Sequence, residues 1–320
     1  MTYRLHLQPY QRRFRQPLQT HHGQWSVREG LLVGLQQGDA IGWGEIAPLP
    51  WFGTETVEEA IAFCDQLSPV LTEQAILEIP DALPACQFGF GSAWESLTQP
   101  SAPAAIVAKD LSGLLPAGDA ARSTWQILWQ NGHRTFKWKI GVADLDHELQ
   151  IFQGLAQELP PEAHLRLDAN GGLTLTQAQR WLECCDRLSR ITLEYLEQPL
   201  PPEQIEIMQQ LGCQFKTPIA LDESVATLPQ LIHCHAQGWQ GIMVVKPAIA
   251  GYPQALRDFL QNHAVNVAFS SVFETEVGRN AAIKLAQDCS TSRAMGFGTE
   301  HWFLKEYPVE TAHVLAAPIS

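Results

Sequence analysis

Three acidic residues recur at nearly even spacing, and each closes a short apolar run. Asp168 ends the run His-Leu-Arg-Leu-Asp, Glu197 ends Thr-Leu-Glu-Tyr-Leu-Glu, and Asp222 ends Ile-Ala-Leu-Asp. They lie roughly 25–30 residues apart, which is the length of one strand, loop, helix and return loop. Three carboxylates at the ends of three successive parallel strands suit a hard divalent cation such as Mg²⁺, with Mn²⁺ as the alternative.

Lysines bracket these acids along the chain. Lys137 and Lys139 stand in the string Phe-Lys-Trp-Lys-Ile before Asp168, and Lys246 follows Asp222 at the end of another apolar run. Residues two apart on a strand share a face, so Lys137 and Lys139 point into the barrel if their apolar neighbours face the helices. Because lysines are costly in a purely structural interior, we expect them to face carboxylates or a bound anion, where a partly desolvated lysine can act as a base.

Other interpretations of the same residues explain less. A lone acid at a strand end often caps a helix or pairs with arginine, but that role does not account for acids and lysines together. The string His233-Cys234-His235 lies in a helical pattern, where residues two apart diverge, so it does not favour a zinc site. A Schiff-base lyase using Lys139 or Lys246 would leave the three acids without a role. A non-catalytic barrel would leave both the acids and the lysines without one.

The elements that carry these residues alternate between strand and helix from residue 104 onward. The eight predicted strands span residues 104–108, 135–140, 164–168, 192–197, 219–222, 241–246, 265–270 and 294–298. Eight apolar strands separated by helical patterns favour a closed parallel (β/α)8 barrel over an open doubly wound sheet. In such a barrel the carboxyl ends of the strands converge on one face, where active sites lie.

The first hundred residues have a different pattern, with three predicted strands followed by helices over 56–67 and 84–97. Strands followed by helices are typical of a small α+β module. We therefore expect an α+β domain over residues 1–100 and a barrel over residues 101–300. The C-terminal tail, residues 301–320, is expected to pack back on the N-terminal domain.

Composition limits the partners of this 320-residue chain. The net charge of −13 argues against nucleic acid as a partner, and the chain has no 18-residue apolar stretch for membrane insertion. There is no Cys-x-x-Cys among the seven scattered cysteines and no apolar signal-peptide core at the N-terminus. These features favour a cytoplasmic protein. The predicted cation site and its lysines suit a small-molecule carboxylate substrate, and we expect a monomer or homodimer.

On its motifs, the chain resembles members of the enolase superfamily, of the muconate-lactonising type. The motifs are Lys137-Trp-Lys139, Asp168-Ala-Asn170, Glu197-Gln-Pro199, Asp222-Glu-Ser224 and Lys246. The resemblance implies an α/β fold: a modified (β/α)8 TIM barrel of the (β/α)7β type with an N-terminal α+β capping domain. It also implies that Asp168, Glu197 and Asp222 ligate Mg²⁺, and that Asn170 and Glu223 support these ligands.

The same resemblance implies roles for the lysines. Lys139 takes the proton α to a substrate carboxylate, Lys246 stabilises charge from the opposite side, and Lys137 adjusts Lys139 by like-charge repulsion. Active sites of the enolase superfamily are known to pair a lysine base with Mg²⁺.

Within the superfamily, the chain is most similar to the o-succinylbenzoate synthase family. The string from Gly42 to Thr56 resembles the family's capping-domain loop, which makes Phe52 and Gly53 candidates for substrate binding. The other candidates for substrate binding are Ser270, Ser271, Gly296 and Gly298.

This resemblance implies a carbon–oxygen lyase of menaquinone or phylloquinone biosynthesis. The implied reaction is the syn dehydration of 2-succinyl-6-hydroxy-2,4-cyclohexadiene-1-carboxylate to 2-succinylbenzoate through a metal-stabilised enediolate. The alternative is an N-acyl amino acid racemase or dipeptide epimerase of the same superfamily.

Overall fold

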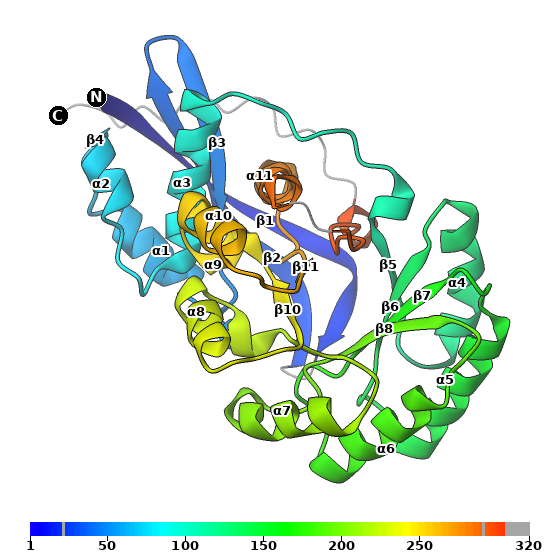
Figure 1. Ribbon diagram of the computed structural model, residues 1–320. Helices are drawn as coiled ribbons and strands as arrows, with labels where there is room; N and C mark the ends of the chain where they lie inside the picture. The colour runs from blue at the N-terminus through cyan, green and yellow to red at the C-terminus, as the bar shows by residue number, and fades with distance from the viewer. Residues whose placement is uncertain (21–22, 290–291, 305–320) are drawn as a thin grey trace.

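The computed structural model of the protein describes residues 1–20, 23–289 and 292–304. These residues form a four-stranded antiparallel sheet near the N-terminus and a seven-stranded parallel sheet. Figure 1 shows the long blue strands of the first sheet running alongside the barrel formed by the second, with the green helices on the outside of the barrel.

The antiparallel sheet has the strand order β3-β2-β1-β4. Its strands are β1 (Thr2–Thr20), β2 (Gly23–Gln37), β3 (Ala40–Ile46) and β4 (Val70–Thr72), and its helices are α1 (Val57–Cys64), α2 (Glu73–Leu77) and α3 (Pro84–Thr98). Thr56 caps the start of α1: the Thr56 hydroxyl accepts a bond from the Glu59 amide, and the Glu59 carboxylate accepts one from the Thr56 amide.

Helix α3 lies directly on β3 because glycine keeps that face of the strand flat. A Cβ atom added to Gly44 would stand 2.0 Å from the carbonyl oxygen of Gly89, and one added to Gly42 would stand 2.2 Å from that of Ala93. Because side chains alternate along a strand, Glu45 points to the opposite side of β3, toward the barrel.

The parallel sheet has its strands in sequence order from β5 to β11. They are β5 (Ser112–Leu115), β6 (Thr135–Lys139), β7 (His164–Asp168), β8 (Thr192–Glu197), β9 (Ile219–Leu221), β10 (Ile242–Val245) and β11 (Val267–Phe269). The accompanying helices are α4 (Ala121–Gln130), α5 (Leu145–Glu158), α6 (Leu175–Asp186), α7 (Ile205–Gln214), α8 (Leu228–Ala236), α9 (Pro247–Ala250), α10 (Pro253–Asn262) and α11 (Glu276–Asp288).

The apolar residues of β6 face these helices, as expected. Trp138 is fully buried and its ring meets that of Trp181 on α6 edge-on at 6.2 Å, while Phe152 on α5 meets Trp181 at 5.4 Å. With Trp138 turned outward, Lys137 and Lys139 point into the barrel.

The predicted first barrel strand over residues 104–108 is wrong. This apolar run lies at the surface, with Val107 53% exposed, and the side chain of Gln287 on α11 bonds both the amide and the carbonyl of Ala104. The first strand of the barrel is β5 instead. Hydrophobicity alone could not separate an apolar run that packs along the outside from one that enters the sheet.

The predicted eighth strand over residues 294–298 is reduced to isolated bridges. Met295 pairs with Leu111 and Gly296 pairs with Ser270, so this segment joins the two outer strands of the sheet. The amide of Ser112 donates to the Met295 carbonyl and that of Gly296 to the Phe269 carbonyl, which closes the ring between β5 and β11. The predicted fold, a (β/α)7β barrel with an α+β capping domain, is confirmed.

The domain boundary near residue 100 stays a prediction. Phe303 pairs with Phe14 of β1, its ring stacks on Phe14 at 4.6 Å, and the Leu304 amide donates to the Arg13 carbonyl. The remainder of the predicted tail, from residue 305 to 320, lies outside the described residues.

Across the part of the chain that the structure describes, no helix has the length and apolar character needed to cross a bilayer.

The close contact between β3 and α3 gives a stability prediction. Gly44→Ala should lower the free energy of unfolding by about 1–3 kcal/mol or more, because the added methyl group meets backbone atoms that have no space to yield. Gly212→Ala in α7 is the control: a Cβ there meets nothing within 4 Å, so this variant should gain about 0.5–1 kcal/mol. Urea unfolding of both variants measures the difference, and equal stability would contradict the packing described.

Candidate active site

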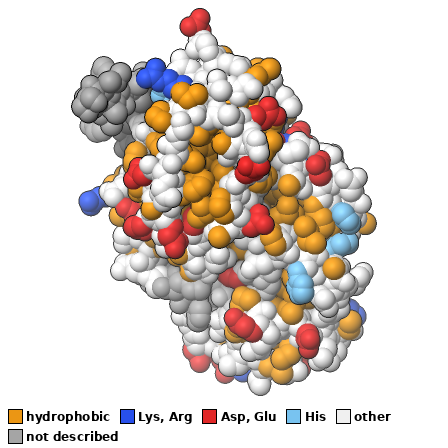
Figure 2. Space-filling model, turned by 90° about the vertical axis from the view of Figure 1, so that its left-hand side faces the viewer, with side chains coloured by type: hydrophobic (Ala, Val, Ile, Leu, Met, Phe, Trp, Pro, Cys, Tyr) orange, Lys and Arg blue, Asp and Glu red, His pale blue; other side chains and the backbone are white. Residues whose placement is uncertain are grey.

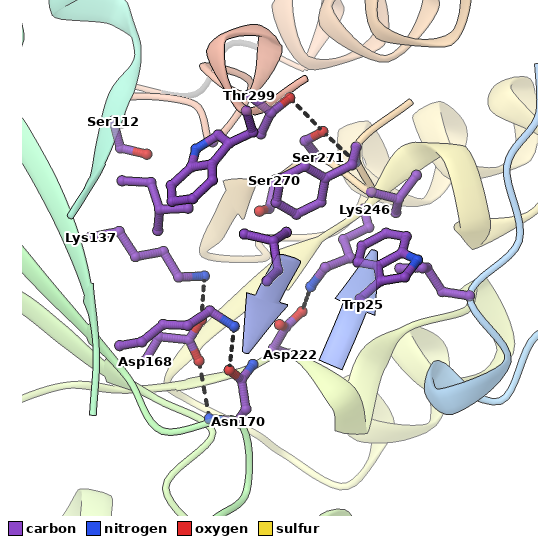
Figure 3. Close-up of a pocket in the computed structure, with 18 of the residues that line it drawn as sticks. Trp25, Ser112, Lys137, Asp168, Asn170, Asp222, Lys246, Ser270, Ser271 and Thr299 are labelled. Carbon is purple, nitrogen blue, oxygen red and sulfur yellow. Dashed lines mark hydrogen bonds and ion pairs between the residues drawn. The ribbon is translucent and has the colours of Figure 1, made fainter. Parts of the chain in front are cut away.

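The carboxyl ends of the barrel strands open into a cavity of about 290 Å³ that the capping domain covers. Figure 3 shows Lys137, Asp168 and Asn170 on one side of this cavity, with Asp222 and Lys246 on the other. β6, which carries Lys139, and β10, which Lys246 follows, stand four strands apart in the sheet, so these two lysines approach the cavity from opposite sides.

The two lysines of β6 have different partners. The Lys137 ammonium lies 2.8 Å from Asp168 Oδ2 and 2.6 Å from Glu197 Oε1. Lys139 donates instead to Asn170 Oδ1 at 2.7 Å, and Asn170 Nδ2 donates to Glu223 Oε1 at 3.1 Å. Lys137 therefore neutralises the predicted metal ligands, while Lys139 is held by a neutral amide at the cavity wall.

Lys246 is buried, directly after the end of β10. Its ammonium forms an ion pair with Asp222 and lies 4.3 Å from the centroid of the Phe52 ring. A cation over an aromatic face is stabilised by the ring's negative charge distribution. The capping domain thus contributes Phe52 directly to the surroundings of a barrel lysine.

Burial and neighbouring charges shift the pKa values of the carboxylates and of Lys137. Burial and the neighbouring Asp168 carboxylate raise the pKa of Glu197 to about 8, and burial with Asp222 raises the pKa of Glu223 to about 7. Burial also acts to raise the pKa of Asp168, but the Lys137 ammonium outweighs it, so that pKa is lowered. Conversely, burial lowers the pKa of Lys137, but Asp168 and Glu197 hold it well above its usual value.

These donors fit a hard divalent cation. Among the described residues no three acidic, histidine or cysteine side chains already converge as a metal-binding group, and Lys137 and Lys246 contact the predicted ligands Asp168 and Asp222. However, Glu197 Oε2 is buried without a hydrogen-bond partner, and Asp168, Glu197 and Asp222 offer oxygen donors only. Mg²⁺ prefers oxygen ligands, so these three carboxylates would hold it in exchange for their lysine contacts.

Residues that follow the predicted ligands hold the strand ends together. Gln198, fully buried, accepts a bond from the Asp222 amide at 2.9 Å and donates to Ser224 Oγ at 2.8 Å, which joins the end of β8 to the end of β9. Gln198 and Asn170 have positive φ angles of 35° and 43°. Backbone strain of this kind persists only where the surroundings impose it, and here it turns the chain right after each carboxylate.

Glu148, on α5, is a positioning residue that sequence reasoning missed. Its buried carboxylate accepts bonds from three consecutive amides, Gly141 at 2.7 Å and Val142 and Ala143 at 3.0 Å each. These amides form the loop that follows Lys139. In the sequence, Glu148 is one more acid in the first turn of a helix, so only the fold reveals its role.

Most of the residues that were predicted to bind the substrate line the cavity. Phe52, Ser270, Ser271, Gly296 and Gly298 line it. A Cβ on Gly296 would stand 2.9 Å from Ser270 Oγ, so glycine allows these two segments to meet. Gly53 does not line the cavity; with φ at 81° it ends the short turn Pro50–Phe52 that presents Phe52.

The sequence did not single out the aromatic wall above the lysines. Trp25 and Trp51 of the capping domain, Phe273 after β11 and Trp302 near the C-terminus all line the cavity. Trp25 meets Trp51 at 5.0 Å and Phe273 at 5.5 Å, each edge-on. Large aromatic residues are also common in cores, so their positions in the sequence gave no signal that they face a cavity.

An antiparallel cap over a (β/α)7β barrel, with acids and lysines at the strand ends, defines an enzyme of the enolase superfamily. Residues 120–317 match the family model described as enolase C-terminal domain-like, and residues 4–97 match that of the MenC N-terminal domain. The chain belongs to the o-succinylbenzoate synthase family of this superfamily, as predicted.

Known proteins resemble the chain over nearly its whole length. It is 40% identical to o-succinylbenzoate synthase of Thermosynechococcus vestitus, over 92% of this chain and 91% of that protein. The crystal structure of o-succinylbenzoate synthase from Thermosynechococcus elongatus BP-1, with Mg in its active site, is 39% identical and covers 93% and 94% of the two chains at a TM-score of 0.87. The L-Ala-D/L-Glu epimerase from Bacillus subtilis is 19% identical over 95% and 91% of the chains at a TM-score of 0.76, which shows the shared fold alone.

The ligand assignment of Asp168 can be tested directly. Asp168→Asn should weaken Mg²⁺ binding by about 100-fold or more, because an amide supplies no negative charge to the cation. Calorimetric titration of the purified protein with MgCl₂ measures the affinity. Glu203→Gln, which changes an exposed acid away from the cavity, serves as the control. Equal Mg²⁺ affinity in the two variants would rule out Asp168 as a ligand.

Proposed function

We propose that this chain catalyses the Mg²⁺-dependent syn dehydration of 2-succinyl-6-hydroxy-2,4-cyclohexadiene-1-carboxylate to 2-succinylbenzoate. The observation that carries the proposal is the placement of Lys139 and Lys246 on opposite sides of a cavity lined by the buried carboxylates of Asp168, Asp222 and Glu223. The family to which the chain belongs supports the choice of substrate.

Lys139 is the base in this proposal. Among the described residues it forms no ion pair with a carboxylate, unlike Lys137 and Lys246, and its nitrogen faces the cavity while donating to Asn170. It removes the proton on the carbon next to the substrate carboxylate. The resulting ammonium then protonates the departing hydroxyl group on the same face, the carbon–oxygen bond breaks, and water leaves as the ring becomes aromatic.

Asp168, Glu197 and Asp222 hold the Mg²⁺ ion in the proposed mechanism. Bound Mg²⁺ would supply positive charge for the substrate carboxylate and for the negative charge that develops there as the proton leaves. Lys246 adds a cation from the opposite side, next to the Phe52 ring. Before the metal binds, Lys137 neutralises Asp168 and Glu197.

The upper part of the cavity favours a substrate with an apolar body. Its wall there is aromatic, and the acids that line the cavity in the described part of the chain, Asp168, Asp222 and Glu223, all stand at the metal end. Among the described residues, a dipeptide with a free ammonium group would find no carboxylate at the far end. Dipeptide epimerisation is therefore less supported than dehydration, while N-acyl amino acid racemisation, which needs both Lys139 and Lys246, is an outcome to test.

We further propose a role in menaquinone or phylloquinone biosynthesis, a cytoplasmic location, a monomeric or homodimeric state, and no nucleic-acid partner. The net charge of −13 supports the last point. The face in Figure 2 agrees with it, because scattered acidic side chains outnumber basic ones there. The domain division at residues 1–100 and 101–300 is part of the same proposal, as is Mn²⁺ as a substitute for Mg²⁺.

An absorbance assay with the cyclohexadiene carboxylate tests the reaction. We expect the diene absorbance to disappear with MgCl₂ present and to persist after the metal is removed with EDTA. A chain that leaves the diene intact but exchanges the Cα proton of N-acyl amino acids with solvent deuterium would be a racemase instead.

The role of Lys139 has its own test. Lys139→Ala should lower kcat for dehydration by about 10³-fold or more, because it removes the group that moves the proton, while circular dichroism should show an intact fold. Lys216→Ala changes an exposed lysine and is the matched control. Activity of Lys139→Ala within about tenfold of wild type would refute the base assignment.

A further inference from the structure

Glu45 connects the capping domain to the barrel through one buried carboxylate. It belongs to β3, is 0% exposed, and its oxygens lie at the start of α11 in the barrel. Oε2 accepts bonds from the amides of Thr275 and Gly278, each at 2.9 Å, and the Thr275 hydroxyl also donates to it. Oε1 accepts the Tyr10 hydroxyl from β1. A side chain of one domain thus caps a helix of the other.

The surroundings are built to admit this carboxylate. A Cβ on Gly278 would stand 2.8 Å from Glu45 Oε2, so only glycine leaves room for it in the first turn of α11. In the sheet, Gly44 has no side chain on the face of β3 that packs against α3. The next residue, Glu45, points to the opposite face of β3. The contact is therefore set by glycines on both sides of the junction.

The loop from residue 271 to 275, which Glu45 holds at its end, forms part of the cavity wall. The Glu274 carboxylate accepts bonds from Ser271 Oγ at 2.9 Å and from the Val272 amide at 2.6 Å, and Ser271 Oγ accepts the Phe273 amide at 2.8 Å. Phe273 has a φ of 62°, a left-handed conformation that a residue with a Cβ rarely adopts without external support.

The ring of Phe273 is the point where the two domains meet at the cavity. It contacts Phe14 of β1 at 5.4 Å and Trp25 of β2 at 5.5 Å, both edge-on. Phe273 and Trp25 both line the cavity, far along the chain from the metal ligands. The aromatic wall is thus half capping domain and half barrel, and its geometry depends on how the domains dock.

We propose that Glu45 is a positioning residue: by docking the capping domain onto the loop 271–275, it sets the aromatic wall that receives the far end of the substrate. It touches neither the reacting atoms nor the metal ligands, so it acts on substrate affinity and not on proton transfer. The choice of ligand in the following test rests on the proposed function.

The test compares Glu45→Gln with wild type. Glutamine replaces one accepting oxygen by an NH₂ group that faces backbone donors, so the loop should detach from β3. We expect the Kd for 2-succinylbenzoate, measured by calorimetry with MgCl₂ present, and the KM for the diene to rise by about tenfold or more. We expect kcat to stay within about threefold of wild type. Mg²⁺ affinity should not change.

Amide hydrogen exchange gives a readout that needs no substrate. The amides of Val272, Phe273, Thr275 and Gly278 should lose protection in Glu45→Gln. The matched control is Asp186→Asn, because Asp186 accepts bonds from the amides of Lys216 and Thr217 and from the Thr217 hydroxyl, the same donor types. Its donors lie just before the start of β9, at the end of the barrel away from the cavity. Asp186→Asn should therefore leave exchange in the loop and ligand affinity unchanged.

A milder variant keeps the proposal testable if Glu45→Gln does not fold. Tyr10→Phe removes only the hydroxyl that donates to Glu45 Oε1, and it should shift exchange and ligand affinity in the same direction by a smaller factor. Unchanged exchange at 272–278 in Glu45→Gln, or ligand affinity within about twofold of wild type, would overturn the proposal. If wild type itself neither converts the diene nor binds 2-succinylbenzoate, the proposed function fails, whereas the exchange comparison still decides whether Glu45 docks the loop.

Discussion

The mutual repulsion of the buried carboxylates at the barrel mouth is the constraint on which the rest of the site depends. Asp168, Glu197 and Asp222 end neighbouring strands and are almost completely buried, so they are stable as anions only beside cations. Lys137 and Lys246 supply that charge from both sides. A divalent cation can replace part of it, since its charge and coordination suit oxygen donors better than an ammonium does.

The capping domain is needed because the barrel alone leaves this charged mouth open to water. Phe52 covers Lys246, and Trp25 and Trp51 add apolar surface over the cavity. Excluding water strengthens each electrostatic interaction inside. The junction between the domains is itself polar and buried, with Glu45 as its centre, so the angle of docking is fixed by directional hydrogen bonds. A purely apolar interface would allow the capping domain to slide against the barrel more easily.

The charged centre of the site could be predicted from the sequence, but its aromatic wall could not. Lys137 and Asp168 could be placed because strand periodicity and the βα repeat determine where each side chain points. Trp25 and Phe273 come from segments about 250 residues apart that meet only through tertiary packing. No local pattern distinguishes an aromatic residue that faces a cavity from one that faces a core. The same limit explains the surface run at 104–108, whose composition resembles that of a buried strand.

Four buried acids of the described chain divide into two pairs according to the groups that satisfy them. Glu45 and Glu148 accept bonds chiefly from backbone amides, which are fixed donors, and each holds a loop beside the cavity. Glu197 and Asp222 depend on lysine side chains, which can move, and Glu197 keeps one oxygen without a partner. A fixed donor cannot be exchanged for a ligand, whereas a flexible ammonium can. Carboxylates that serve as a scaffold therefore need amide partners, and carboxylates that must exchange partners with a metal ion need lysines.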